Sequence, residues 1–123
     1  MALTVEKLKE GDCEYAVGGR LDGTTARQLE AALRPALSNP DTKSLVLRMT
    51  DLDFISSAGI RVLIETQNTL SSRGGSVLLV DLQPQIAKVL EIIKALPGIT
   101  VFRNIEEMDE YLATIQKRVK SGE

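Results

Sequence analysis

Histidine is absent from this chain of 123 residues, and cysteine occurs once, at Cys13. A chain without histidine lacks the commonest general base, the Ser-His and Cys-His nucleophile pairs and the commonest ligand of transition metals. A single cysteine allows no disulfide within the chain and no cysteine cluster around a metal. These shortages argue against most hydrolases, a redox protein and a metal centre. We therefore expect a non-enzymatic protein without a cofactor, in which Cys13 is a small core residue.

Aromatic residues and net charge are also low, with two Tyr, two Phe, no Trp and a formal charge of −2. Nucleic-acid binding usually needs a basic surface or aromatic side chains on which bases stack, so we expect no direct contact with nucleic acid. No apolar run approaches the ~20 residues that span a bilayer, and the first residues do not resemble a secretory signal. We expect a cytoplasmic protein without membrane insertion or a small-molecule substrate, and by elimination a protein partner.

The length indicates a single domain over residues 1–123, with a frayed tail from about residue 118. Two strands are predicted over residues 3–8 and 13–17. They flank Glu10-Gly11-Asp12, whose turn chemistry favours a hairpin. The pair Gly18-Gly19 then indicates a bend.

Helical periodicity and capping residues predict about four helices, which begin near Thr25, Ser57, Pro84 and Asn104. Thr25 and Gln28 have the spacing of a capping box. Further strands are predicted over residues 45–49, 77–80 and 99–102. The order β-β-α-β-α-β-α-β-α implies parallel strand pairs joined by right-handed crossovers, with an antiparallel edge from the opening hairpin. The fold class is therefore α/β with a mixed sheet.

The most informative segment runs from Asp51 to Leu63, where a strand-like apolar run gives way to helical periodicity through two serines and a glycine. A helix start exposes unpaired backbone N–H groups and the positive end of the helix dipole. A serine hydroxyl there can cap the helix, bind an anion or accept a phosphate. On the residues alone, Ser57 is most simply an N-cap, with Ser56 as an alternative cap.

With that order of elements, residues 45–47 and 52–60 resemble the STAS domain, named for sulphate transporters and anti-sigma-factor antagonists. The run Gly19-Arg20-Leu21-Asp22 is similar to the family's glycine-x-leucine-aspartate turn after the second strand. Residues 74–80, followed by Pro84, are similar to its fourth strand and the helix after it. The resemblance covers nearly the whole chain and implies a STAS-like fold.

In the antagonist branch of that family, an aspartate-serine-serine-glycine motif precedes the second helix, and a partner that is both kinase and anti-sigma factor phosphorylates its first serine. The resemblance places this acceptor at Ser57 and the motif glycine at Gly59. Ser56 stands in place of the motif aspartate, Ala58 in place of the second serine, and Arg48 where the third strand often ends in an acid or amide. The changes at Ser56 and Arg48 make the surroundings less negative, which favours a phosphate but removes groups that the kinase recognises.

The resemblance therefore implies a partner-binding surface around the start of the second helix. Its predicted residues are Asp22, Ser56, Ala58, Gly59, Arg61, Val62 and Glu65, with Ser57 as the phosphorylation site. Several have simpler alternatives. Asp22 can make local turn hydrogen bonds, and Arg61 can be a solvated side chain near Glu65 instead of a phosphate partner. Val62, on a nominally outer helix face, can pack against a neighbouring helix.

The function implied is a regulator of transcription that binds an anti-sigma factor with serine kinase activity while Ser57 is unmodified, and is switched off by phosphate. The alternative is a STAS subunit that docks in a lipid-transport ATPase or a stress-sensing complex without a phosphorylation cycle, which the loss of the acid at Ser56 favours. A third possibility, nucleotide or anion binding at the Ser57 helix start, lacks a glycine-rich phosphate loop. A homodimer is compatible with each.

Overall fold

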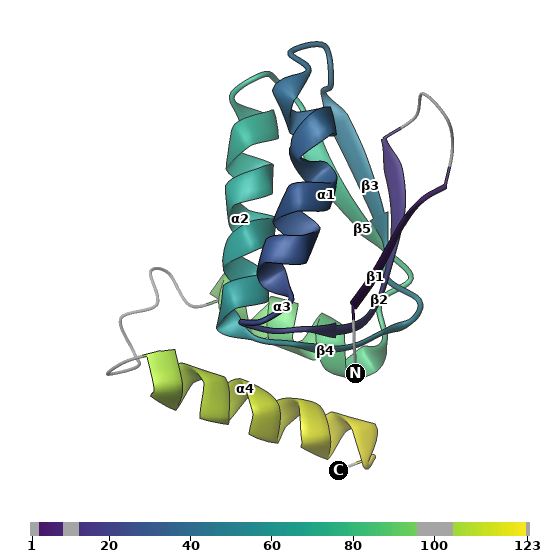
Figure 1. The fold of residues 1–123 in the computed structure, drawn as a ribbon. Helices are drawn as coiled ribbons and strands as arrows, with labels where there is room; N and C mark the ends of the chain where they lie inside the picture. The colour runs from purple at the N-terminus through teal and green to yellow at the C-terminus, as the bar shows by residue number, and fades with distance from the viewer. Residues whose placement is uncertain (1–2, 9–12, 96–104, 123) are drawn as a thin grey trace.

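The structure is a computed structural model that describes residues 3–8, 13–95 and 105–122. Its strands form a mixed sheet, and α1 and α2 lie side by side against one face of that sheet (Figure 1). The core lies between these two layers. Its fully buried side chains include Leu21, Leu29, Leu33, Leu45, Leu47, Leu52, Ile55 and Leu70.

The predicted hairpin is confirmed: β1 (Leu3–Lys7) pairs antiparallel with β2 (Glu14–Leu21), and its turn lies outside the described residues. The predicted bend at Gly18-Gly19 is wrong, because β2 continues through both glycines. Gly19 has a φ of 94°, a conformation that glycine adopts without strain. The register of β2 against β4 shifts next to it, between Gly19 and Arg20.

Helix α1 (Ala26–Ser38) begins next to Thr25, as predicted, but the reciprocal hydrogen bonds of a capping box lie three residues earlier in the chain, between Asp22 and Thr25. A carboxylate oxygen of Asp22 accepts the backbone N–H groups of Thr24 and Thr25 at 2.9 and 3.1 Å, and the Thr25 hydroxyl accepts the N–H of Asp22 at 2.9 Å. Gln28 donates its side-chain amide to the Leu3 carbonyl instead. The predicted pairing of Thr25 with Gln28 is therefore wrong.

Strands β3 (Ser44–Arg48) and β5 (Ser76–Val80) pair in parallel, and β3 also pairs in parallel with β2, as the crossover pattern predicts. The structure adds a strand that the predicted order omits: β4 (Leu52–Ile55) follows a turn after β3 and pairs in parallel with the end of β2. The strand predicted over residues 99–102 lies outside the described residues.

Helices α2 (Ser57–Ser71) and α3 (Pro84–Ala95) begin where the sequence predicts. Helix α4 (Ile105–Lys120) follows a gap in the described residues that includes the predicted start at Asn104, and it continues through residues 118–120 of the segment expected to fray. None of the helices within residues 3–8, 13–95 and 105–122 is both long and apolar enough to cross a membrane.

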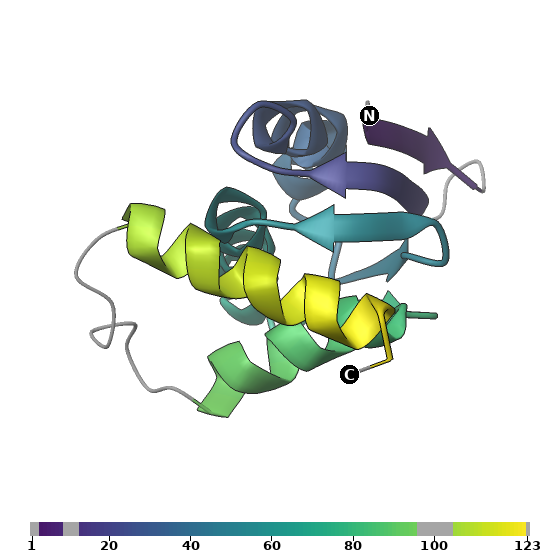
Figure 2. The same cartoon turned by 90° about the horizontal axis from the view of Figure 1, so that it is seen from below.

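Helix α4 lies beside β4 and closes the edge of that strand that faces away from β2 (Figure 2). The closure depends on Gln116, which is 2% exposed. Its side-chain oxygen accepts the Ile55 N–H at 2.9 Å, and its side-chain nitrogen donates to the Ile55 carbonyl at 2.8 Å. Lys120 also pairs with Asp53 at 2.5 Å. A glutamine thereby supplies the donor and the acceptor that a further strand would offer an open edge.

Replacing Gln116 with alanine should destabilise the fold by about 2 kcal/mol or more, because both backbone groups of Ile55 lose a buried partner. Urea denaturation measures the change in the free energy of unfolding. Lys117→Ala is the matched control, since Lys117 is the exposed neighbour on the same helix and should change stability by no more than about 0.5 kcal/mol. Equal losses in the two variants would contradict this role of Gln116.

Candidate functional site

The candidate site is the junction at which β4 leads into α2. Ser56 occupies the N-cap position in an extended conformation, and Ser57 is the first helical residue, so the prediction that Ser57 is the N-cap is wrong. The Ser56 N–H donates to the Leu21 carbonyl at 2.9 Å, which joins the junction to β2. The Ser56 carbonyl accepts the N–H of Ile60 and so begins the helix.

Neither serine hydroxyl caps α2. Ser56 is 7% exposed, and among the described residues its hydroxyl has no hydrogen-bond partner. Ser57 is 9% exposed, and the helix has no side-chain hydrogen bond from its N-cap and no acid in its first turn. The positive end of the α2 dipole is therefore not compensated by the residues that precede or begin the helix.

The compensating charge comes from α4. The Ser57 N–H donates at 2.9 Å to the carboxylate of Asp109, a residue 52 positions later in the chain. A carboxylate at this point satisfies an N–H that has no partner within the helix and lies at the favourable end of the helix dipole. Local sequence patterns did not identify Asp109 as a site residue. The only available signal was that Asp109, Gln116 and Lys120 share one face of a helix by spacing.

Gly59 lets α2 approach the sheet closely. A Cβ atom at this position would lie 2.6 Å from Cγ of Leu21 and 3.0 Å from Cγ1 of Ile55. Those separations are shorter than packed carbon atoms allow. Gly59 therefore holds the start of α2 against β2 and β4, and with it the position of Ser57.

A hollow of about 270 Å³ lies between α1 and α2 and brings several predicted site residues together. Its lining includes Ala58, Arg61, Val62 and Glu65 from α2 and Arg27 and Glu30 from α1. Val62 is 7% exposed and belongs to the core, so its predicted outer-face position is wrong and the simpler alternative, packing between helices, holds. Arg61 is exposed and forms no ion pair with any residue in the described part of the chain.

Asp22 makes local turn hydrogen bonds, which the sequence offered as the simpler alternative to contact with a partner. Burial acts to raise the pKa of Asp22, but the N–H groups of Thr25 and Thr24 and the guanidinium of Arg20 outweigh it, so the pKa lies below its usual range. Arg20 pairs with Asp22 at 3.0 Å and stacks on the Phe54 ring at 3.7 Å. Asp22 is thus ionised and held at the end of β2. Its contact with a partner stays a prediction.

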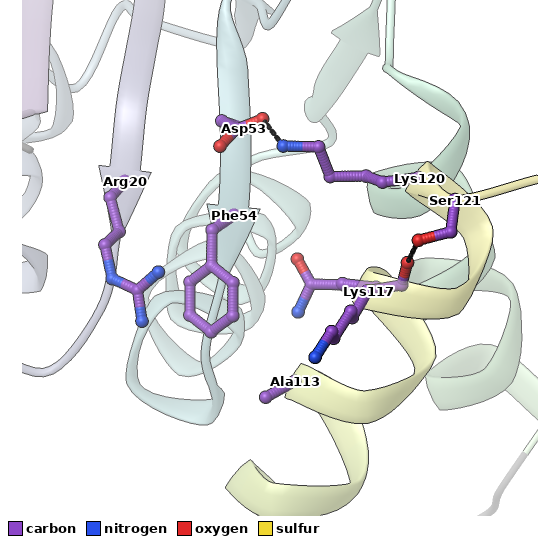
Figure 3. Close-up of a pocket in the computed structure, with 8 residues that line it drawn as sticks. Arg20, Asp53, Phe54, Ala113, Lys117, Lys120 and Ser121 are labelled. Atoms are coloured by element: carbon purple, nitrogen blue, oxygen red, sulfur yellow. Dashed lines mark hydrogen bonds and ion pairs between the residues drawn. The ribbon is translucent and has the colours of Figure 1, made fainter.

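A second hollow, of about 450 Å³, lies between α4 and strands β2 and β4. Figure 3 shows Arg20 beside Phe54 on the strand side and Lys117 and Lys120 on the helix side. Lys120 is neutralised by Asp53 and Arg20 by Asp22. Arg48 does not line this hollow, and it forms ion pairs with Glu14 at 3.3 Å and Asp81 at 2.7 Å. Within the described residues no cluster of histidine, cysteine or acidic side chains could bind a metal.

Comparison with known proteins points to one family. The model of the STAS domain matches residues 5–108. Over 92 residues the chain is 34% identical to a Bordetella bronchiseptica protein named as a candidate anti-sigma factor antagonist, BtrV, which covers 75% of this chain and 78% of that protein. An anti-sigma factor antagonist from Mycobacterium paratuberculosis has a similar fold, with a TM-score of 0.63 at 18% identity over 91% of this chain and 95% of that one. The Bacillus cell fate determinant SpoIIAA in its phosphorylated form gives 0.58 at 19% identity, over 75% and 83% of the two chains.

Gly59→Ala should destabilise the fold by about 1–3 kcal/mol, because the added methyl group overlaps Leu21 and forces α2 away from the sheet. Urea denaturation of the purified variant measures the change. Gly23→Ala provides the control, since a Cβ there meets nothing within 4 Å. If both alanine variants are as stable as the wild type, close packing at Gly59 does not set the position of the helix.

Proposed function

This chain belongs to the STAS domain family, and we propose that it acts as an anti-sigma factor antagonist. It binds an anti-sigma factor with serine kinase activity through the start of α2, and phosphorylation of Ser57 by that kinase switches the binding off. The observation that carries the proposal is the position of Ser57. It is the first residue of α2, at the position that the resemblance aligns with the acceptor serine of the family's motif.

The charges around Ser57 support a phosphate at this position. Helix α2 has no acid in its first turn, and the carboxylate at its start, that of Asp109, belongs to α4, so a phosphate that displaced Asp109 would meet the positive end of the dipole. Arg61 lies one turn further along the helix, exposed and without an ion pair among the described residues. Side chains four residues apart on a helix are neighbours. A phosphate on Ser57 would therefore have a cation within reach.

Phosphorylation needs no catalytic group from this chain. The kinase transfers the γ-phosphoryl group of ATP to the Ser57 hydroxyl oxygen, forming a P–O bond to serine and breaking the bond to ADP. The hydroxyl proton passes to a base on the kinase. This chain supplies only the acceptor hydroxyl, which agrees with a sequence that contains no histidine. We infer that it is a substrate and ligand of the kinase and not itself an enzyme.

The phosphate would act on binding through charge. It adds about −1.5 to −2 units of charge at neutral pH. Burying that charge in a protein interface without a matched partner costs several kcal/mol. The surface that receives the kinase would comprise Ser57, its neighbours Ser56 and Ala58, the exposed side chains Arg61 and Glu65, and Asp22. Phosphorylation at its centre would release the partner.

One observation favours the second candidate, a STAS subunit that docks on a larger complex without a phosphorylation cycle. Ser57 is only 9% exposed, which leaves little of the residue accessible to a kinase. Ser56, in place of the family's aspartate, also removes a group that the kinase recognises. In that case the partner would dock through another face.

Mutation of the acceptor tests the phosphorylation site. With the partner kinase and labelled ATP, Ser57→Ala should abolish incorporation of phosphate, whereas Ser56→Ala should only reduce it. Ser71→Ala, at the far end of α2, is the control and should label like the wild type. Mass spectrometry that locates the phosphate solely on Ser56 would overturn the assignment.

A carboxylate at the acceptor position tests the binding surface. Ser57→Asp should raise the dissociation constant for the partner at least about 30-fold, which corresponds to about 2 kcal/mol. The sheet and its α1–α2 layer should stay folded, since an acid at a helix start is favourable by ~0.3–1 kcal/mol. Calorimetry measures the affinity, with Ser71→Asp as a control of equal charge. Unchanged affinity in Ser57→Asp would place Ser57 outside the interface and favour the docking subunit.

A further inference from the structure

Helix α4 contacts the β4–α2 junction at three successive points. Asp109 accepts the Ser57 N–H at 2.9 Å, Gln116 pairs with both backbone groups of Ile55, and Lys120 pairs with Asp53. The order of these contacts shows that α4 runs opposite to the chain direction of β4, as Figure 2 shows. The amino-terminal half of α4 therefore meets the start of α2.

Consecutive backbone amides at this junction have partners on opposite sides. The N–H groups of Ile55 and Ser57 donate to α4 side chains, whereas the N–H of Ser56 between them donates to the Leu21 carbonyl on β2. The protection of Ile55 from exchange with solvent thus depends on α4, and the protection of Ser56 depends on the sheet. The two neighbouring amides report separately on the two attachments.

Helix α4 presents a carboxylate, that of Asp109, to the start of α2. Its first turn carries Glu106 and Glu107, and Asp109 follows. A phosphate on Ser57 would stand next to the Asp109 carboxylate and compete with it for the same helix start. Like charges this close repel strongly when partly shielded from water. Arg61, one turn along α2, attracts the phosphate. The Asp109 carboxylate is therefore the group that the phosphate displaces.

We propose that Asp109 and Ser57 form a phosphate-sensitive latch for α4. In the unmodified chain the Asp109 carboxylate occupies the start of α2 and holds α4 against β4. A phosphate on Ser57 takes that place, displaces Asp109 and loosens α4, which uncovers the N–H and carbonyl of Ile55 at the edge of β4. The biological trigger rests on the proposed function, but the response of α4 to a charge at Ser57 is a property of this chain alone.

Amide hydrogen exchange, followed by NMR on the full chain, tests the latch without any kinase. The charge is introduced as Ser57→Asp and, in a second form, as phosphoserine incorporated at position 57 during synthesis. Protection of the Ile55 amide should fall at least about tenfold in both forms, while that of Ser56 changes less than about threefold. Ser71→Asp, with the same added charge at the other end of α2, should leave both amides unchanged.

A second substitution assigns the effect to Asp109. In Ser57→Asp combined with Asp109→Asn, the repulsion is removed, and the protection of Ile55 should return to within about threefold of its value in Asp109→Asn alone. Unchanged protection of Ile55 in the phosphoserine form overturns the latch, as does a loss of protection at Ser56 equal to that at Ile55. No recovery in the double variant also overturns it. Failure of the kinase to label Ser57 would contradict the proposed function, but the hydrogen-exchange results would still test the latch.

Discussion

The junction between β4 and α2 depends on one buried amide, that of Gln116. Ile55 has its N–H and its carbonyl directed toward α4, and Gln116 satisfies both groups. Ser56, the next residue, is tied to the opposite side by its bond to Leu21. The chain is therefore held from two sides just before the helix begins. Gly59, one turn later, packs against Leu21. The contacts of Ile55, Ser56 and Gly59 therefore fix the position of Ser57.

The same arrangement explains the electrostatics of the site. A helix start with no acid of its own is an unfilled anion position. Here Asp109 fills it from another element, and Arg61 stays exposed one turn away. The junction thus contains the Asp109 carboxylate, the Arg61 cation, which has no ion pair among the described residues, and Ser57, whose N–H binds that carboxylate. A modification that adds negative charge to the Ser57 hydroxyl changes the balance of the whole junction.

Local patterns predicted much of the fold, and contacts distant in sequence account for what they missed. The hairpin, the pairing of β3 with β5 and the starts of α2 and α3 follow from turn residues, apolar periodicity and a proline in the first helical turn. Strand β4 was missed because it has four residues and merges with the serine segment. Val62 was placed on an outer face because periodicity identifies one apolar face, whereas α2 packs against both the sheet and α1. Asp109 and Gln116 act on residues 52 and 61 positions away, and no local pattern encodes such a pairing.

The substitution that most separates this chain from the antagonist motif is Ser56, and the structure gives it a physical meaning. The family's motif carries an acid directly before the acceptor serine, where this chain has a buried hydroxyl without a hydrogen-bond partner among the described residues. A carboxylate is nevertheless present at the start of α2, because Asp109 supplies it from α4. An acid at position 56 would be covalently fixed beside the acceptor and could not withdraw from a phosphate. In the proposed latch, an acid on a separate helix can withdraw, and its departure loosens the docking of that helix. The proposed latch therefore links the modification of one serine to the placement of α4.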